Sequence, residues 1–235
     1  INEAGIKSSV RQEVVYNFLN SIGDANELVR KTMAGIYKNE LPKSKGETLA
    51  DLVGDEYPFE ADPMPNLYFT RDPFASIGNG VSLNKMYSVT RNRETIYADY
   101  IFRYHKDFRG KVERFYDRNF DYHIEGGDIL NLTESVLAIG ISQRTEAEAI
   151  DRIANEIFIN STNDKIKTIL AFNIPNNRAM MHLDTVFTQI DVDKFTIHPG
   201  MHEALQVFEI NKVGNEIKIN EVNDELENIL AKDLG

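Results

Sequence analysis

The pattern of hydrophobic and polar positions predicts a helical beginning to the chain. Apolar residues at spacings of three and four follow Ser9, which we expect to cap a helix that Gly23 ends. Asp24 is expected to cap a second helix, with Pro42 just past its end. Because two short helices bury little apolar surface by themselves, they indicate part of a helical bundle. Two helices packed on a main domain would give the same pattern.

A polar segment rich in proline separates this beginning from the rest. Pro58, Pro63 and Pro65 favour extended backbone over helix, so residues 43–65 are expected to form a loop. We place the domain boundary here, with residues 1–60 as a partial helical bundle and linker and residues 61–235 as the main domain. Residues 67–70 then have the aromatic and β-branched content of a strand, which would run directly into a charged pair and a proline.

In the main domain, strands and helices alternate. Residues 78–80 (GNG) predict a hairpin, which a helix follows. Residues 129–132 and 136–141 then predict two strands, Thr145 and Glu148 a capping box that opens a helix, and residues 167–174 another strand. Further strands are expected at 186–190, 195–197, 206–210 and 216–220, before a helix over 225–232. Helices between strands indicate an α/β fold with a β-β-α-β unit.

Composition narrows the classes of function. The chain has 235 residues, 27% of them charged, and a formal net charge of −11. This charge argues against a nucleic-acid partner, because such proteins neutralise phosphates with Lys and Arg. No apolar run is long enough for a membrane span and no export signal is visible, so we expect a cytoplasmic protein. Cysteine is absent, which excludes disulfides and thiolate metal sites within these residues.

Two stretches concentrate the candidate chemistry. In residues 122–130, Glu125 and Asp128 flank a Gly-Gly step, which permits positive φ angles and a close approach of other groups. In residues 180–185, which we expect to be extended, His182 and Asp184 are two positions apart and would point to one face. Together these stretches supply three carboxylates and one imidazole, which can hold a cation and move protons.

Other interpretations of these residues remain open. A single histidine on an apolar strand is more often a core residue, and Glu125 or Asp128 could simply accept hydrogen bonds from nearby backbone. His182 and Asp184 could also bind a metal ion, with Glu125 or Asp128 completing the set. Asp72 and the arginine before it could form a solvated turn. Converging acids would instead favour a cation, and a planar guanidinium fits carboxylates well.

Five motifs in order carry a close resemblance to the bacterial arginine deiminases. They are residues 63–74 (PMPNLYFTRDPF), 91–95 (RNRET), 124–128 (IEGGD), 140–145 (GISQRT) and 181–185 (MHLDT). The resemblance implies a pentein fold, an α/β propeller of β-β-α-β modules, with part of an inserted helical bundle. It also implies a hydrolase acting on the C–N bond of a linear amidine, which converts free L-arginine to L-citrulline and ammonia without a metal or an organic cofactor.

The resemblance also implies roles for individual residues. Asp72 and Asp184 resemble the pair that clamps the guanidinium, and Glu125 and His182 resemble the general acid and base. The residues that resemble the lining of the substrate site are Asn66, Phe69, Arg91 and Arg144, with both arginines reaching the α-carboxylate. Asp128 and Gly127 resemble the support of the Gly-Gly turn.

The chain departs from the family pattern at the nucleophile. In the family, a cysteine thiolate near the C-terminus attacks the guanidinium carbon, and these 235 residues contain no cysteine. The beginning at Ile1 and the end at Gly235 look cut, so we expect a fragment that lacks the family's first module and its C-terminal segment. Such a fragment is predicted to be inactive by itself, and its oligomeric state, monomer or homo-oligomer, stays open.

Three alternatives compete with a deiminase of free arginine. The first is a metal-assisted hydrolase that uses His182, Asp184 and Glu125. The second is a non-catalytic module that binds arginine or a partner through acidic residues. The third is an enzyme for methylated arginine, peptidyl arginine or agmatine, although Arg91 and Arg144 favour a free α-carboxylate.

Overall fold

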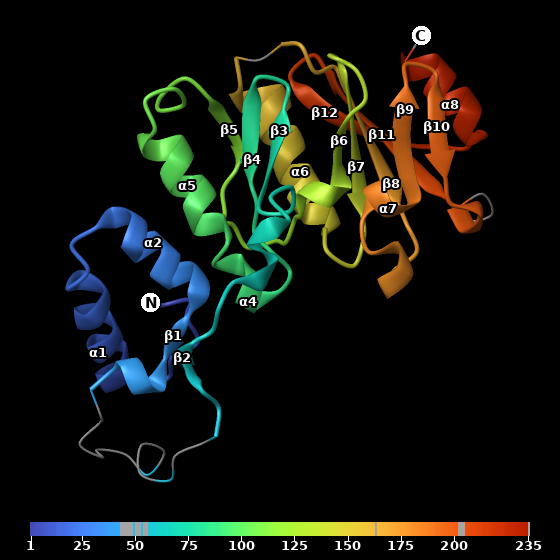
Figure 1. The fold of residues 1–235 in the computed structure, drawn as a ribbon. Helices are drawn as coiled ribbons and strands as arrows, with labels where there is room; N and C mark the ends of the chain where they lie inside the picture. Colours follow the sequence, from blue (N-terminus) through green and yellow to red (C-terminus); the bar gives the residue numbers. More distant parts are fainter. Residues whose placement is uncertain (43–48, 50–52, 54–55, 163, 202–204, 235) are drawn as a thin grey trace. The chain divides into compact units, whose positions relative to one another are not determined.

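Contacts along the chain divide the protein into two units, which are described separately. The computed structural model describes residues 1–42, 49, 53, 56–162, 164–201 and 205–234. The first unit comprises Ile1–Phe69 and Ser88–Glu94, and the second comprises Thr70–Tyr87 and Thr95–Gly235. Figure 1 traces both along the sequence colours.

The two predicted helices of the first unit are present, with different ends. Helix α1 spans Ser9–Asn20, and its cap is Ser8, whose hydroxyl accepts the Arg11 backbone N–H, so the predicted cap at Ser9 is wrong by one residue. The helix ends before Gly23 because Ser21 caps it. Helix α2 spans Ala25–Ala34, and Asp24 caps it as predicted by accepting the Glu27 N–H at 2.8 Å.

The rest of the first unit contains short elements that the sequence pattern missed. Strand β1 (Ile36–Tyr37) pairs antiparallel with β2 (Phe59–Ala61), which lies inside the segment predicted as loop. Part of that segment lies outside the described residues. The other elements are η1 (Lys38–Glu40), η2 (Pro65–Tyr68) and α4 (Val89–Asn92). The unit's core gathers Ile6, Val15, Ile36, Leu41 and Ala61.

The strand predicted at residues 67–70 is wrong. Residues Pro65–Tyr68 form the 3₁₀ turn η2, and the Phe69 N–H donates to the Asn66 carbonyl at 2.9 Å. Pro65 is the first residue of this turn, where its fixed φ suits a helical start and its missing N–H has no consequence. The aromatic content of this segment therefore misled the prediction, because the local proline decides the backbone.

The second unit is mixed α/β and contains two β-β-α-β series. The first consists of β3 (Phe74–Ile77), β4 (Gly80–Leu83), α5 (Thr95–Tyr104) and β5 (Glu113–Tyr116). β3 and β4 form the predicted hairpin around Gly78, which has a φ of 54°, and β5 lies parallel to β4. Strand β5 was not predicted, because Glu113 and Arg114 interrupt its apolar pattern.

The second series supplies the last three strands of a five-stranded sheet in the order β12-β11-β8-β7-β6. It comprises β6 (Ile129–Asn131), β7 (Val136–Ile141), α6 (Ala147–Asn155) with the π-helical turn η4 (Glu156–Asn160), and β8 (Thr168–Asn173). β6 and β7 are antiparallel, and β7 and β8 are parallel, so the predicted β-β-α-β unit is confirmed. Figure 1 shows α6 on one side of these strands.

The remaining elements follow the predicted order of strands and a helix. β9 (Phe187–Asp191) and β10 (Lys194–Ile197) form a separate antiparallel pair, and β11 (Gln206–Val213) and β12 (Glu216–Val222) form a hairpin that turns at Gly214. Helix α8 spans Leu226–Leu234. The short turns are η3 (Gly126–Asp128), η5 (Arg178–Met180), α7 (Leu183–Val186) and η6 (Pro199–Met201).

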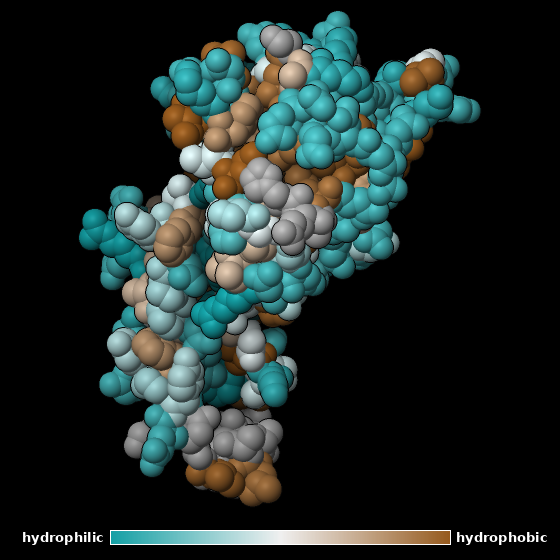
Figure 2. Space-filling view, turned by 90° about the vertical axis from the view of Figure 1, so that its right-hand side faces the viewer, coloured by the Kyte–Doolittle hydropathy of each residue, from teal (hydrophilic) through white to brown (hydrophobic). Residues whose placement is uncertain are grey.

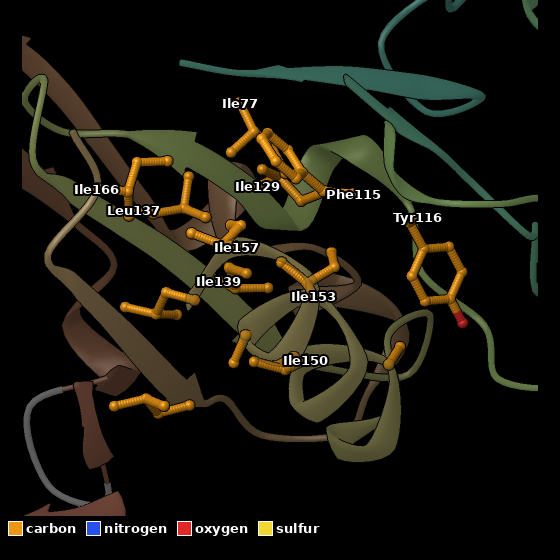
Figure 3. Close-up of a cluster of buried hydrophobic side chains, with 14 of the residues drawn as sticks. Ile77, Phe115, Tyr116, Ile129, Leu137, Ile139, Ile150, Ile153, Ile157 and Ile166 are labelled. Carbon is orange, nitrogen blue, oxygen red and sulfur yellow. The ribbon is translucent and has the colours of Figure 1, made fainter. Parts of the chain in front are cut away.

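The central strands are apolar on both faces because both faces are covered. Leu137 and Ile139 of β7 enter one core cluster, and Ala138 between them enters another, as the two-residue period of a strand requires. The first cluster includes the inward side of α6, where Ile150 and Ile153 are almost fully buried (Figure 3). The second includes side chains of α7 and α8. Strand β7 is therefore packed on both of its faces.

One face of the molecule is mostly hydrophilic. On the face drawn in Figure 2, hydrophilic residues predominate, and hydrophobic ones show in smaller patches between them. Within the part of the chain that the structure describes, no helix combines the length and the apolar character that crossing a bilayer requires.

Candidate active site

The Gly-Gly step lies where three segments meet. A Cβ atom on Gly126 would stand 2.0 Å from the Arg71 carbonyl oxygen, and one on Gly127 would stand 2.6 Å from Nδ1 of His182. The Gly126 N–H also donates to the Asp72 carbonyl at 3.1 Å. Neither glycine is among those with positive φ. The glycines are thus required for close approach, as expected, and not for a left-handed backbone.

Glu125 and His182 form a buried pair beside this step. Glu125 is fully buried, and its Oε2 lies 2.9 Å from Nε2 of His182. The other carboxylate oxygen accepts the Tyr87 backbone N–H at 3.0 Å. Burial by itself would lower the pKa of His182, but the hydrogen bond to Glu125 and the charges of Asp128, Glu125 and Asp72 outweigh it, so the pKa is raised. The pair can therefore hold a proton near neutral pH.

Asp128 fixes the segments around this pair. Its Oδ2 accepts the hydroxyls of Ser142 at 2.7 Å and Thr145 at 2.6 Å, and its Oδ1 accepts the Leu183 N–H at 2.7 Å. Complete burial raises the pKa of Asp128 to about 6, although His182 and these hydrogen bonds act in the opposite direction. Asp128 thus joins the loop before α6 to the backbone that follows His182.

The predicted capping box is wrong, and its threonine belongs to this network. Helix α6 has Glu146 at its cap position, with no side-chain cap hydrogen bond. The Thr145 hydroxyl instead donates to Asp128 and accepts the backbone N–H of Glu125 at 3.2 Å. A capping box and a buried hydroxyl bridge have similar sequence signatures, and packing against Asp128 decides between them.

The segment that carries His182 and Asp184 is not the extended run that we predicted. His182 itself is extended, but it caps α7, and Thr185 donates both its N–H and its hydroxyl to the His182 carbonyl. Asp184 lies in the first turn of α7. Burial raises the pKa of Asp184, while His182 and Arg71 lower it and Asp72 raises it further. The two side chains still act on each other electrostatically, although no strand aligns them.

Arg71 and Asp72 do lie in a bend and a turn with the Arg71 side chain half exposed, as one interpretation expected, but this turn is also bonded to neighbouring segments. The Asp72 carbonyl accepts the Asn84 side-chain amide at 2.7 Å, besides the Gly126 N–H. The Arg71 guanidinium contacts Asp184, with Nε 3.3 Å from Oδ2, and donates from Nη2 to the Ile129 carbonyl at 2.9 Å. This segment is therefore fastened to the start of β6.

Three of these side chains also satisfy the geometry of a possible metal site. One ligand atom each from Asp72, Glu125 and His182 lies within 4.8 Å of the others. The set predicted from the sequence contained Asp184 in place of Asp72. Two carboxylates and an imidazole are suitable ligands for Zn²⁺. The same three groups can equally surround an organic cation and exchange protons with it.

Arg144 approaches the pair from the loop before α6. Its guanidinium lies over the Tyr87 ring, 5.0 Å from the ring centre, and its Nη1 is 3.9 Å from Oε1 of Glu125. The Nε atom of Arg144 is buried and has no hydrogen-bond partner among the described residues. A buried donor without an acceptor is costly, so this arginine is suited to binding an anionic group.

The other predicted lining residues belong to the first unit. Asn66 lies in η2, and Phe69 directly follows it with an exposed ring. Arg91 in α4 forms two hydrogen bonds to Glu94, at 3.1 and 3.0 Å. The candidate residues that come together all belong to the second unit. They are Asp72, Glu125, Asp128, Arg144, His182 and Asp184.

Sequence reasoning missed four residues of the cluster. They are Arg71, Tyr87, Ser142 and Thr145, which contact Asp184, Arg144 and Asp128 as described above. A signal existed for the two hydroxyl residues, since Ser142 and Thr145 stand close together in one short polar loop. Tyr87 contributes through a backbone N–H and a ring face, which a sequence pattern does not reveal.

Comparison with known proteins gives consistent matches. A family model described as arginine deiminase matches residues 1–235. An arginine deiminase of Treponema denticola is 58% identical over 237 residues, which cover 100% of this chain and 58% of that protein. An arginine deiminase of Streptococcus uberis is 52% identical over 237 residues, covering 100% of this chain and 57% of that protein. The chain thus spans a little over half the length of these relatives.

Solved structures that resemble part of this chain do so at low sequence identity. A dimethylarginine dimethylaminohydrolase, as an adduct with S-methyl-L-thiocitrulline, has a TM-score of 0.46 and 19% identity, over 60% of this chain and 50% of that chain.

Proposed function

The chain belongs to the arginine deiminase family, and from this membership we propose that it supplies the guanidinium-binding and proton-transfer groups of an enzyme that hydrolyses free L-arginine. The products would be L-citrulline and ammonia. The observation that carries the proposal is the gathering of Asp72, Glu125 and His182 within 4.8 Å, with His182 close enough to Asp184 to lower its pKa. The carboxylates lie around the His182 imidazole, and together they would stabilise a planar cation.

We assign the guanidinium clamp to Asp72 and Asp184. A guanidinium carries a permanent charge and donates several hydrogen bonds in one plane, which two carboxylates can accept from opposite edges. The raised pKa of Asp184 supports this role, because burial beside Asp72 leaves two acids that a bound cation would stabilise. A neutral ureido group would gain much less from the same carboxylates, so product release is favoured.

Glu125 and His182 are assigned the proton transfers. A thiolate sulfur forms a bond to the guanidinium carbon, one nitrogen takes a proton from the His182–Glu125 pair, and ammonia leaves as the C–N bond breaks. A water then returns its proton to the pair while its oxygen bonds to the same carbon. The hydroxyl of this adduct then loses its proton as the C–S bond breaks, which restores the thiolate and leaves citrulline, and the proton leaves with ammonia as ammonium. The raised pKa of His182 suits a group that begins this cycle protonated.

The chain as it stands lacks the sulfur for this route. Its 235 residues contain no cysteine, so the proposal assigns these residues binding and proton transfer, and no bond to the substrate carbon. Asp128 and Gly127 keep the pair in place, since Asp128 holds the loop at Thr145 and the backbone at Leu183.

Recognition of the amino-acid end of the substrate is assigned to Arg144. Its buried Nε lacks an acceptor among the described residues, and the α-carboxylate of free arginine would supply one. The family resemblance also assigns Arg91, Asn66 and Phe69 to the lining of the substrate site. This assignment favours free arginine over agmatine, which has no carboxylate, and over peptidyl arginine, whose carboxyl group is in an amide.

The architecture proposal extends the observed β-β-α-β series. We propose that residues 61–235 hold central modules of a pentein-type propeller, and that residues 1–60 are part of an inserted helical domain with its linker. The series β3-β4-α5-β5 and β6-β7-α6-β8 support repeated modules, since each has an antiparallel pair followed by a parallel strand. A cytoplasmic location and homo-oligomer formation stay predictions.

Binding of L-arginine by the 235-residue chain tests the proposed function. Isothermal titration calorimetry should detect one site for L-arginine and at least about tenfold weaker binding of neutral L-citrulline. Asp184→Asn should weaken arginine binding by about tenfold or more, whereas Asp191→Asn, a change to an exposed acid at the end of β9, should leave it unchanged. Equal affinity for arginine and citrulline would overturn the proposal.

The metal-ligand geometry of Asp72, Glu125 and His182 favours a second candidate, a metal-assisted hydrolase. Elemental analysis of the purified chain separates the two, because this candidate requires about one metal ion per chain. A chain that holds such an ion stoichiometrically, and loses it in His182→Ala, would support the metal enzyme over the deiminase.

A further inference from the structure

Asp184, which we assign to the substrate's guanidinium, already contacts a guanidinium of the chain. Nε of Arg71 lies 3.3 Å from Oδ2 of Asp184. A bound arginine substrate would therefore share this carboxylate with Arg71 or displace it. The other contacts of Arg71 show whether a substrate could displace it from Asp184.

Arg71 is fastened at three points. Its side chain donates from Nη2 to the Ile129 carbonyl at 2.9 Å, at the start of β6. Its own carbonyl oxygen stands where a Cβ on Gly126 would be 2.0 Å away, so the backbone is packed against the glycine step. The next residue, Asp72, accepts the Gly126 N–H. An arginine held in this way is part of the framework and is not a plug that leaves on substrate binding.

The charges around Asp184 indicate what the contact between Arg71 and Asp184 does. The charged groups that face Asp184 are Arg71 and Asp72 from the segment before β3, and His182 from the segment before α7. Burial and Asp72 both favour the protonated, neutral form of Asp184, while His182 and Arg71 favour the ionised form. Arg71 is half exposed, but its charge is permanent, unlike that of His182.

We infer that Arg71 is a positioning residue, which holds the Asp184 carboxylate through Oδ2 in the orientation that binds the substrate's guanidinium. A carboxylate has about four lone-pair sites, so one that accepts from Arg71 retains acceptors for a second guanidinium. The inference rests on the proposed function for its substrate. The contact itself is independent of any ligand.

Two measurements on the 235-residue chain test this role. In Arg71→Gln, the ¹³Cγ resonance of Asp184 should titrate at higher pH than in the unchanged chain, because the nearby positive charge is gone. L-arginine binding should weaken by about tenfold near neutral pH, and its loss on acidification should begin at higher pH. Arg71→Lys, which keeps the charge but not the planar fork, should restore the titration more fully than the affinity.

The matched control is Arg103→Gln. Arg103 pairs with Asp99 on α5, so this variant removes the same charge from the same unit without touching Asp184. It should leave both the Asp184 titration and arginine affinity unchanged. A thermal melt of each variant separates loss of fold from loss of function, and Arg71→Lys remains informative if Arg71→Gln does not fold.

The outcomes separate this inference from the proposed function. If the unchanged chain does not bind L-arginine, the proposed function fails, yet a comparison of the Asp184 resonance in the unchanged chain and in Arg71→Gln still reports whether Arg71 acts on Asp184. If arginine binds and Arg71→Gln alters neither affinity nor the titration, the positioning role is overturned. Tighter arginine binding in Arg71→Gln would also overturn it, because that result would identify Arg71 as a competitor for Asp184.

Discussion

At the scale of single residues, the arrangement depends on carboxylates that are buried with defined partners. Asp128 accepts from Ser142, Thr145 and Leu183, so one carboxylate connects two loops that are distant in sequence. Gly140 leaves the space for it, since a Cβ there would stand 2.5 Å from Oδ1 of Asp128. We therefore expect Asp128 to hold Glu125 and His182 in position, and not to react itself.

The pKa of Asp128 predicts a particular pH dependence of stability. Burial raises this pKa from 3.8 to about 6, so the folded state binds the proton more tightly than the unfolded state. The stabilisation is complete below about pH 4 and is lost as pH rises through about 6, and the raised pKa of His182 acts in the same direction. The free energy of unfolding in urea should therefore fall across this window, with Asp128 contributing up to about 3 kcal/mol.

Asp128→Asn tests this prediction. An asparagine keeps the size of Asp128 and does not titrate in this range. The variant should flatten the pH dependence between about pH 4 and 6. An unaltered slope in Asp128→Asn would mean that other groups produce the pH dependence.

Some residues of the candidate site could be found from the sequence, and others could not. Acids near Gly-Gly and a histidine beside an acid were visible as candidates, and the second unit gathers Asp72, Glu125 and His182. Their catalytic roles stay predictions. Arg71 and Tyr87 could not be found, because their contacts with Asp184 and Arg144 depend on backbone that only the folded chain brings together.

At the scale of elements, long apolar runs gave correct predictions, whereas two segments beside the candidate site did not. The strands β7 and β8 and the helix between them follow directly from residues that must be covered on both faces. Residues 67–70 and 180–185 failed, because a proline in one and a capped turn after His182 in the other override local propensity. Functional segments are where such failures are expected.

Helix α6 offers a test of the element scale. Ile153 is fully buried between the helix and the strands around it, so Ile153→Ala should lower the free energy of unfolding by about 2–5 kcal/mol. Glu148→Ala, on the exposed side of the same helix, should change it by less than about 0.5 kcal/mol. Chemical denaturation followed by circular dichroism measures both, and similar losses in the two variants would contradict the described packing.

At the scale of the whole molecule, the acidic balance and the absence of cysteine bear on activity. A net charge of −11 suits a cationic substrate, and the mixed α/β class was predicted from the alternation of elements. The division into two units was less accessible, because Ser88–Glu94 joins the first unit although the flanking chain belongs to the second. No local sequence pattern indicates that Ser88–Glu94 belongs to the first unit.

The whole chain should bind arginine without converting it. Because the 235 residues hold no cysteine, purified material should release no citrulline above background. A colorimetric citrulline assay over a long incubation measures this, with an arginine-free sample as control. Turnover that persists after repurification would show that the thiolate route does not apply to this chain.

The most direct measurement is a crystal structure of the 235-residue chain with L-arginine. The account predicts the guanidinium within hydrogen-bond distance of both Asp72 and Asp184, with its central carbon beside the Glu125–His182 pair and Arg71 still in contact with Asp184. An arginine bound elsewhere, or one whose guanidinium contacts neither Asp72 nor Asp184, would contradict it.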